Sequence, residues 1–425
     1  MNIAQASKEE LADLLSSLET QFHTFKAREL SLDLTRGKPA PEQLALSESL
    51  DGILGGDFTT DNGVDVRNYG GIDGIPEAKA LLGGLFDLES DETLIGGNSS
   101  LQLMYLTMDM AMNLGLGDNP PWREREAVKF LCPSPGYDRH FSVCEHLGIE
   151  MLAVPMTDDG PDMAACEALV RQDDAICGIW CVPRFSNPTG CVYSDETVAR
   201  LAALPAIANS GFLVMWDNAY AVHSLNEDAP ELASITAACR EHNTLGQVVQ
   251  FGSTSKVTFA GAGVAFMGSS ADTLAAIKGH LAYQTIGPDK INQLRHVRLF
   301  PDRSAITAHM NKHASLIRPK FECVLQTLER ELGESGMGEW TTPQGGYFIS
   351  FDTLPGLARE VVATAGELGV KLTPAGATFP YGKDPADSNI RLAPTFPSMR
   401  DVETSAEVFC LCVKLASVRQ RLADA

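Results

Sequence analysis

The sequence predicts a three-layer α/β domain, in which helices cover both faces of a mostly parallel sheet, together with a smaller α+β domain. Three observations lead to this fold class. Between about Pro76 and Ala282, short apolar runs alternate with stretches of helical spacing, as parallel strands joined by helices do. From about Ser304, a long helical region precedes one strand-like segment and two more helical stretches. The chain has 425 residues, which is enough for one large and one small core.

The first predicted element is a helix within residues 6–29. Apolar side chains recur there at helical spacing, and Ser7 followed by Glu10 resembles a capping box. Short apolar runs then predict the strands of the large sheet, at Ala127–Leu131, Met151–Val154, Ile176–Val182, Phe212–Trp216 and Val248–Phe251.

The C-terminal part is predicted to begin with a long helix over about Ser304–Glu334. A strand at 345–352 and helices at 355–369 and 401–421 follow it. We therefore expect an N-terminal segment (1–50) that joins the small domain, a large domain (51–303) and a small C-terminal domain (304–425).

Charge and cysteine content limit the classes of partner. Lys and Arg number 33 against 55 Asp and Glu, so the net charge of −22 repels nucleic acid and anionic membrane surfaces. The ten cysteines form no C-x-x-C pair and no metal-ligand spacing, so neither a metal site nor a disulfide framework is expected. The N-terminus lacks the features of a signal peptide, and no apolar stretch reaches membrane-spanning length. We expect a cytoplasmic protein with no nucleic-acid or membrane partner.

Polar side chains follow three of the predicted strands. Asn187 lies in N-P-T-G after the first of these strands, Asp217 ends the next and is followed by Tyr220, and Lys256 follows the third. Because the carboxyl ends of parallel strands share one edge of a sheet, we expect these side chains to meet there. A buried carboxylate requires a cationic partner, and a lysine with little water around it can condense with a carbonyl.

This set of groups matches what pyridoxal 5′-phosphate needs from a protein. The cofactor requires a lysine for its aldehyde, an acid against its pyridine nitrogen, and donors for its ring oxygen and phosphate. Asp217 would keep the ring nitrogen protonated, while Asn187 and Tyr220 would donate to the ring oxygen. Each motif alone is equally explained by an ordinary turn or a surface lysine, so the prediction depends on their joint occurrence.

The motifs S-T-S-K, N-P-T-G and D-N-A-Y, at these separations, resemble those of class I/II aminotransferases of pyridoxal-phosphate fold type I. The stretches L-T-R-G-K-P, D-V-R-N-Y-G-G, P-G-Y-D-R-H-F and S-K-V-T-F-A-G-A-G-V resemble the aspartate aminotransferase subgroup Ic, and the resemblance covers almost the whole chain. It implies a large domain with a mostly parallel sheet of the seven-stranded type. It also implies transfer of an amino group between an amino acid and a 2-oxo acid, with aspartate and 2-oxoglutarate as the expected pair.

The resemblance further implies how the cofactor is held. Lys256 would carry the cofactor and later move the substrate's Cα proton, and Tyr137 would stack on the pyridine ring. The phosphate would be bound by the helix-opening residues and by hydroxyls near the lysine: Asn98, Ser99, Ser100, Ser253 and Ser255. Tyr69 would reach the phosphate of the neighbouring subunit, so the family pattern implies a homodimer with shared active sites.

The substrate would be bound near the C-terminus. Arg391 matches the arginine that binds the α-carboxylate through its planar donors, with Asn187 beside it. Gly37 matches the glycine whose backbone lies beside the substrate.

Two positions depart from the family pattern. Many relatives hold the phosphate with an arginine eight residues after the lysine, where this chain has Val264. Members specific for dicarboxylates often have an arginine before the I-G-P segment, where this chain has Gln284. The cationic candidates for a distal carboxylate are therefore Arg36, Lys38 and Arg139.

Other functions remain open on the sequence alone. Within the same fold they are an aromatic or alanine aminotransferase, a decarboxylase or a β-lyase. A non-catalytic ligand-sensing domain is the alternative from another class. Such regulators usually carry a basic DNA-binding module, for which the acidic residues before Leu32 leave no room.

Overall fold

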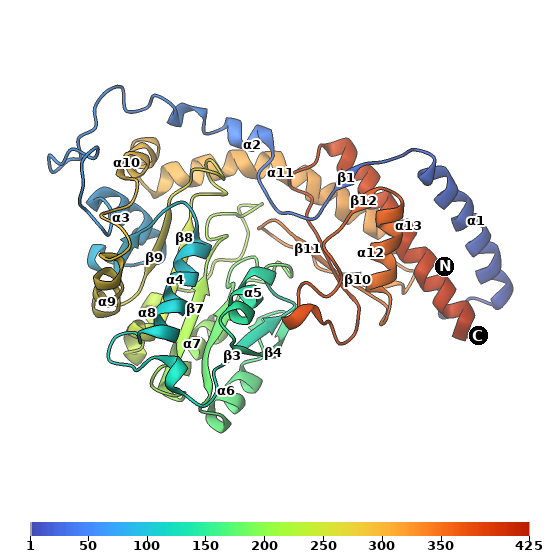
Figure 1. Cartoon of the computed structure of the whole chain (residues 1–425). Coiled ribbons are helices and arrows are strands. Elements are labelled where there is room, and N and C mark those ends of the chain that lie inside the picture. The colour runs from blue at the N-terminus through green and yellow to red at the C-terminus, as the bar shows by residue number, and fades with distance from the viewer. Residues whose placement is uncertain (1, 425) are drawn as a thin grey trace.

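The computed structural model describes residues 2–424 and has a larger and a smaller body (Figure 1). The long helix α11 (Arg303–Leu332) runs from one body into the other, and both chain termini lie at the end of the smaller body. No helix within residues 2–424 combines the length and apolar character needed to span a lipid bilayer.

The larger body is built on an eight-stranded sheet with strand order β2-β9-β8-β7-β6-β3-β4-β5. Its strands are β2 (Thr93–Ile95), β3 (Lys129–Ser134), β4 (Glu150–Thr157), β5 (Gly160–Pro161), β6 (Ile176–Cys181), β7 (Leu213–Asp217), β8 (Val248–Ser253) and β9 (Ala265–Gly268). The five central strands β4, β3, β6, β7 and β8 are parallel, whereas β9 is antiparallel to both of its neighbours. The mostly parallel sheet is confirmed, with the two-residue β5 added to the expected seven strands.

Helices cover both faces of this sheet, as predicted. They are α3 (Pro76–Gly83), α4 (Ser100–Asn113), α5 (Asp138–His146), α6 (Met163–Gln172), α7 (Asp195–Ala203), α8 (Ile235–His242), α9 (Ala271–Leu281) and α10 (Lys290–Leu299). Side chains alternate along β7: Leu213 and Met215 pack in the core with α4, α5 and α9, whereas Val214 and Trp216 pack with α6, α7 and α8. This period of two separates two cores, one on each face of the sheet.

The smaller body has a three-stranded antiparallel sheet of order β10-β11-β13. Its elements are β10 (Gly338–Trp340), β11 (Ile349–Thr353), α12 (Ala358–Glu367), β12 (Val370–Lys371), β13 (Asn389–Leu392) and α13 (Met399–Asp424). The predicted strand at 345–352 begins only at Ile349, because Gly345 and Gly346 pack closely against Phe185 and form a bend.

The N-terminal segment packs on the smaller body. Helix α1 (Lys8–Lys26) begins with the expected capping box, since Ser7 Oγ accepts from the backbone N–H of Glu10 and the Glu10 carboxylate accepts from the N–H of Ser7. Apolar residues of α1 share a core with α13, and β1 (Leu32–Asp33) pairs in parallel with β12. Helix α2 (Pro41–Ala45) then leads to the larger body. This arrangement supports a division into regions 1–50, 51–303 and 304–425, which we propose as the domains.

Candidate active site

A cavity of about 650 Å³ lies where the larger body, the smaller body and the N-terminal segment meet; we call it the central cavity. The sheet side contributes Tyr137, Asn187, Asp217, Tyr220 and Lys256. Ser100, the stretch 35–38, Phe348, Thr373 and Arg391 complete the parts of the wall that matter below. The parallel order β6-β7-β8 is what brings the three strand ends to this one edge.

Asp217 is buried at the floor of the central cavity with one oxygen satisfied. Its Oδ2 lies 3.0 Å from Nε2 of His140, while its Oδ1 has no hydrogen-bond partner within residues 2–424. The Asp217 side chain is only 4% exposed, so the unpaired oxygen is costly unless a ligand supplies a donor. The position suits a protonated ring nitrogen.

The sequence interpretation did not single out His140. Its ring stacks on Trp180, with centroids 4.1 Å apart and an interplanar angle of 7°, which holds Nε2 against Asp217. His140 lies three residues after Tyr137 in P-G-Y-D-R-H-F, and their rings meet edge to face at 4.9 Å. That spacing at the start of a helix places two side chains on one face, and it is the signal that could have identified this histidine.

Lys256 lies in the turn after β8 and is half-buried in the wall of the central cavity, with Nζ 5.1 Å from the centroid of the Tyr220 ring. Burial lowers the pKa of Lys256, and the negative charge of Asp217 only partly opposes this shift. The amine is therefore neutral, and so nucleophilic, over a wider pH range than an ordinary lysine. Burial and the nearby Asp217 raise the pKa of Tyr137 to about 12, and burial raises the pKa of Tyr220 well above its ordinary value, so both hydroxyls keep their protons as donors.

The backbone carbonyl oxygens of this turn contact one tyrosine hydroxyl and two imidazole rings. The hydroxyl of Tyr347 lies 3.5 Å and Nε2 of His223 lies 3.4 Å from the carbonyl oxygen of Lys256. Nε2 of His309 lies 2.9 Å from the carbonyl oxygen of Val257. These contacts fix the backbone position from which the Lys256 side chain extends.

The loop before α4 and the loop around Lys256 are joined at the other end of the site. Ser255 Oγ donates to the carbonyl of Asn98 at 2.7 Å, and Asn98 Nδ2 donates to the carbonyl of Gly261 at 3.0 Å. Ser99 is the N-cap residue of α4, but its hydroxyl makes no capping bond. Ser253 Oγ lies 3.4 Å from the backbone N–H of Ser255. Hydroxyls beside the N-terminus of a 14-residue helix suit an anion.

Val264 offers no contact to that anion site. Its side chain is 2% exposed and packs in an apolar cluster with Leu82 and Phe266. The position that the resemblance associates with an arginine therefore carries no cation in this structure.

Tyr69 lies outside the central cavity of its own chain. Its side chain is 86% exposed and lines a separate surface pocket of about 580 Å³ beside residues 285–288. Lys290 Nζ supports this loop through the carbonyls of Asn68, at 2.8 Å, and Gly70, at 2.5 Å. Tyr69 is thus presented away from the chain that carries it.

Arg391 is buried on β13 and makes three side-chain contacts. Its NH1 donates to Asp138 Oδ1 at 3.0 Å and Asn187 Oδ1 at 3.2 Å, and its NH2 donates to Thr373 Oγ1 at 3.4 Å. Its Nε has no partner within the described residues 2–424. A planar cation held on one side by other groups can accept a carboxylate on its free side. The sequence interpretation did not single out Asp138 or Thr373.

Gly37 lies where no side chain fits. A Cβ atom there would stand 2.5 Å from Cζ of Phe348, and the guanidinium carbon of Arg391 is 4.9 Å from the centroid of the same ring. The glycine therefore allows the N-terminal segment to approach the arginine closely.

Three further cationic side chains, those of Arg36, Lys38 and Arg139, also line the central cavity. All three are exposed at its mouth. Gln284 is not among the lining residues, and its side chain instead contacts His280 at 2.9 Å.

Comparison with known proteins gives one consistent picture. The pattern of the family described as "Aspartate amino-transferase" matches residues 6–425. An aspartate aminotransferase of Corynebacterium glutamicum is 43% identical over 402 residues, which cover 94% of this chain and 93% of that protein.

Solved structures agree with this match. The crystal structure of an aspartate transaminase from Corynebacterium glutamicum superposes with a TM-score of 0.96 at 41% identity, covering 99% of both chains. The α-aminoadipate aminotransferase LysN of Thermus thermophilus, in complex with N-(5′-phosphopyridoxyl)-L-leucine, has a TM-score of 0.75 at 22% identity, covering 94% of this chain and 96% of that one. At that identity the second likeness concerns the fold alone.

Proposed function

This chain belongs to the aspartate aminotransferase family, and we propose that it uses pyridoxal 5′-phosphate to exchange an amino group between aspartate and 2-oxoglutarate. The observation that carries the proposal is that Oδ1 of the buried Asp217 has no partner within residues 2–424 and lies in the same cavity as Lys256, whose pKa is lowered by burial. A buried acid and a lysine of lowered pKa at one sheet edge suit a cationic ring bearing an aldehyde.

The lining of the central cavity fits the ring of this cofactor, and the residues proposed for its phosphate adjoin the lining residues Ser100 and Lys256 along the chain. Asp217 would face the ring nitrogen, Tyr137 would cover the ring, and Asn187 and Tyr220 would donate to the ring oxygen. The phosphate would bind to Asn98, Ser99, Ser100, Ser253 and Ser255 without the arginine common in relatives. When bound, the cofactor withdraws electrons from the substrate's Cα and so weakens the Cα–H bond.

The chain's own groups would perform the remaining tasks. Lys256 would attach the cofactor through its amine and, once released, its Nζ would take the proton from the substrate's Cα. His140 would hold Asp217 in place, and its own ring is fixed by Trp180. The carbonyl oxygens of Lys256 and Val257 are hydrogen-bonded to Tyr347 and His309. Because the backbone of the turn is fixed in this way, Nζ can reach only a limited region around the substrate's Cα.

Arg391 would bind the α-carboxylate of the substrate on its free Nε side, with Asn187 beside it. The pairing with Asp138 on the opposite side keeps the guanidinium plane from turning. Gly37 would let the backbone of the N-terminal segment lie against the same substrate group.

The distal carboxylate of a dicarboxylic substrate would bind to cationic side chains at the mouth of the central cavity. Arg36, Lys38 and Arg139 are the lining cations available there, and the remainder of the surface is strongly acidic on balance. A local cationic mouth attracts a small dianion against a repelling net charge. We propose that these three residues together replace the missing arginine at Gln284.

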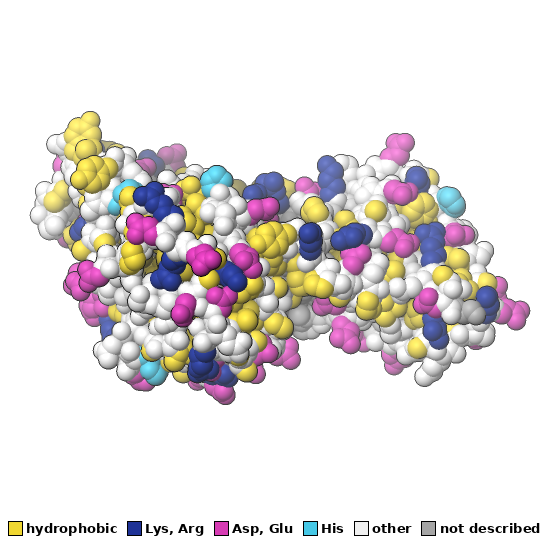
Figure 2. Space-filling model, turned by 60° about the horizontal axis from the view of Figure 1, so that its bottom comes forward, with side chains coloured by type: hydrophobic (Ala, Val, Ile, Leu, Met, Phe, Trp, Pro, Cys, Tyr) yellow, Lys and Arg dark blue, Asp and Glu magenta, His cyan; other side chains and the backbone are white. Residues whose placement is uncertain are grey.

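A homodimer would complete the site. The large apolar side chains Tyr69, Tyr283 and Ile286 are 86%, 90% and 62% exposed, and Tyr69 and Ile286 line one surface pocket. Figure 2 shows hydrophobic side chains standing out at the end of the larger body that is farthest from the smaller one. We propose that a second copy covers them, and that Tyr69 reaches the phosphate of that copy.

Single-turnover measurements with a panel of amino donors test the proposed function. The holoenzyme is mixed with aspartate, glutamate, alanine or tyrosine, and the absorbance of the bound cofactor is followed. We expect aspartate and glutamate to react fastest. Equal or faster reaction of alanine or tyrosine would assign another aminotransferase specificity, and no reaction with any donor would point to a ligand-sensing protein.

A further inference from the structure

A short stretch of the N-terminal segment, residues 35–38, forms part of the cavity wall; we call it the arm. The carbonyl of Thr35 accepts from Thr373 Oγ1 at 3.1 Å, and the same hydroxyl accepts from NH2 of Arg391 at 3.4 Å. Gly37 packs on Phe348, whose ring lies against the same arginine. The arm therefore contacts two of the groups that hold Arg391.

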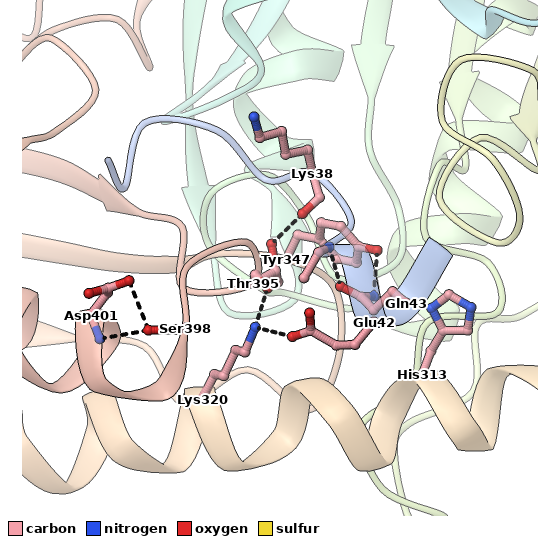
Figure 3. Close-up of polar contacts among 10 residues, drawn as sticks. Lys38, Glu42, Gln43, His313, Lys320, Tyr347, Thr395, Ser398 and Asp401 are labelled. Carbon is pink, nitrogen blue, oxygen red and sulfur yellow. Dashed lines mark hydrogen bonds and ion pairs between the residues drawn. The ribbon is translucent and has the colours of Figure 1, made fainter. Parts of the chain in front are cut away.

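The other end of the arm leads to a buried lysine on α11 (Figure 3). Nζ of Lys320 donates to Glu42 Oε1 at 3.0 Å and to the carbonyl of Thr395 at 2.9 Å. Thr395 Oγ1 in turn donates to the carbonyl of Lys38, the last residue of the arm, at 3.1 Å. Lys320 thus connects to the arm by two routes, through α2 and through the loop after β13.

The next residue of α2 strengthens this attachment. Gln43 is fully buried, its Oε1 accepts from the backbone N–H of Ala40 at 3.0 Å, and its Nε2 lies 3.2 Å from the Tyr347 hydroxyl and 3.1 Å from Nδ1 of His313. A five-residue helix is not stable by itself, so α2 depends on such contacts for its position. In Figure 3, α2 lies beside α11, with Gln43 between Tyr347 and His313.

The energetics make Lys320 an unusual choice for a purely structural contact. Its side chain is only 4% exposed, whereas that of its partner Glu42 is 46% exposed. An ammonium in such a place loses its hydration, and an apolar residue of similar volume is often as stabilising. The ammonium of Lys320 donates to two acceptors, Glu42 Oε1 and the carbonyl of Thr395, and so fixes their relative positions. An apolar side chain would not do this.

We propose that Lys320 is a positioning residue for substrate binding. By holding Glu42 and Thr395 together, it sets the place of the arm, and through Thr373 and Phe348 the arm keeps Arg391 in the orientation that receives the α-carboxylate. The inference rests on the proposed role of Arg391. Lys320 itself does not line the central cavity and does not touch the substrate.

The test uses the holoenzyme and the variant Lys320→Met, which keeps the length of the side chain and removes its donors. Substrate affinity is measured as KM for aspartate and as the equilibrium Kd of 2-methylaspartate, which has both carboxylates but no Cα proton. We expect KM and Kd to rise about tenfold and kcat to fall less than about threefold, because displacement of a binding group weakens binding before it alters the chemistry. The thermal midpoint and cofactor affinity should stay near those of the wild type.

Two further variants separate positioning from stability. Glu42→Gln alters a half-exposed side chain, so the protein should fold, and we expect a smaller rise in Kd, of about threefold. The double variant should bind no more weakly than Lys320→Met alone, because both changes break one connection. The matched control is Lys414→Met, which removes another ion pair to α11, with Glu331 at 2.5 Å, away from the arm. It should leave Kd unchanged.

The inference is overturned if Lys320→Met leaves Kd unchanged, or if Lys414→Met raises it equally. Arg391→Ala, measured alongside, separates this outcome from a failure of the proposed function. If Arg391→Ala weakens binding and Lys320→Met does not, only the inference is wrong. If Arg391→Ala leaves Kd unchanged, the proposed α-carboxylate site is wrong, and the inference about Lys320 is then wrong as well.

Discussion

At the scale of single residues, the site is defined by side chains that each leave one polar atom unpaired. Asp217 has one oxygen against His140, and Arg391 makes three donor contacts; within the part of the chain that the structure describes, the other Asp217 oxygen and Nε of Arg391 have no partner. In a buried setting such atoms raise the free energy of the folded chain unless a ligand pairs with them. We propose that the ligand pairs with both, through a cationic nitrogen at one end and a carboxylate at the other.

Replacing Asp217 should weaken cofactor binding. Asp217→Asn keeps the size of the side chain but removes the charge that would face the ring nitrogen, so we expect the Kd of pyridoxal phosphate to rise at least about tenfold. Equilibrium dialysis of the variant measures this without reference to catalysis. Asp217→Ala should have a larger effect, and unchanged affinity in both would place the acid's function elsewhere.

Replacing Arg391 should discriminate amino acids from other amines. Arg391→Lys retains a charge but loses the planar pair of donors, so we expect kcat/KM for aspartate to fall about a hundredfold. Arg391→Ala should lose more. An amine without an α-carboxylate provides the control, since its half-reaction rate should hardly change. Equal losses for all substrates would make Arg391 a structural residue.

Changing Lys256 to alanine should leave a folded protein that still binds pyridoxal phosphate, but reversibly. The contacts proposed for the ring and the phosphate do not involve Nζ, whereas the proposed removal of the Cα proton does. Dialysis should then remove the cofactor completely, and steady transamination should be lost. Retained turnover would contradict the assignment of Lys256.

At the scale of elements, α11 carries buried imidazoles that hold the turn after β8. His313 and His309 lie 3.1 Å apart, and His309 contacts the carbonyl of Val257. Burial, with some contribution from His309, lowers the pKa of His313 to about 4, and burial lowers that of His309 as well. The helix thus contacts the turn that carries Lys256 through neutral side chains.

These histidines predict acid sensitivity of the fold. An unfolded histidine has a pKa near 6.5, so between about pH 6.5 and 4 the unfolded chain binds a proton that folded His313 does not. Stability from this group is present above pH 6.5 and is lost as the pH falls toward 4. His313→Gln should reduce the dependence of unfolding free energy on pH by about 1.4 kcal/mol per pH unit in that window. Urea unfolding at several pH values measures it, and an unchanged slope would contradict the prediction.

At the scale of the whole molecule, two copies should share each active site. Tyr69→Phe should weaken phosphate retention while the dimer persists, because only one hydroxyl is removed. Mixing Lys256→Ala with Tyr69→Ala subunits should restore activity, because one of the two sites in each mixed dimer is native. Random pairing gives about a quarter of the wild-type activity. Absence of recovery, in samples shown by mass spectrometry to contain mixed dimers, would argue against shared sites.

Much of the architecture was predictable because it depends on local pattern. The apolar runs that became β6, β7 and β8, and the capping box of α1, are readable from neighbours in sequence. Strand ends were less predictable. β3 continues to Ser134 because it is hydrogen-bonded to β4 there, and backbone pairing leaves no mark on the hydrophobic period.

The sequence by itself determined the fold class and the chemistry of the sheet edge, because parallel strands bring Asn187, Asp217 and Lys256 together whatever the details of packing. Only the tertiary structure decided how those groups are held. The stacking of His140 on Trp180, the pairing of Asp138 with Arg391, and the attachment of the arm to Lys320 join residues 40 to more than 250 positions apart. Such contacts arise when separate elements pack, and no spacing along the chain encodes which side chains then face each other.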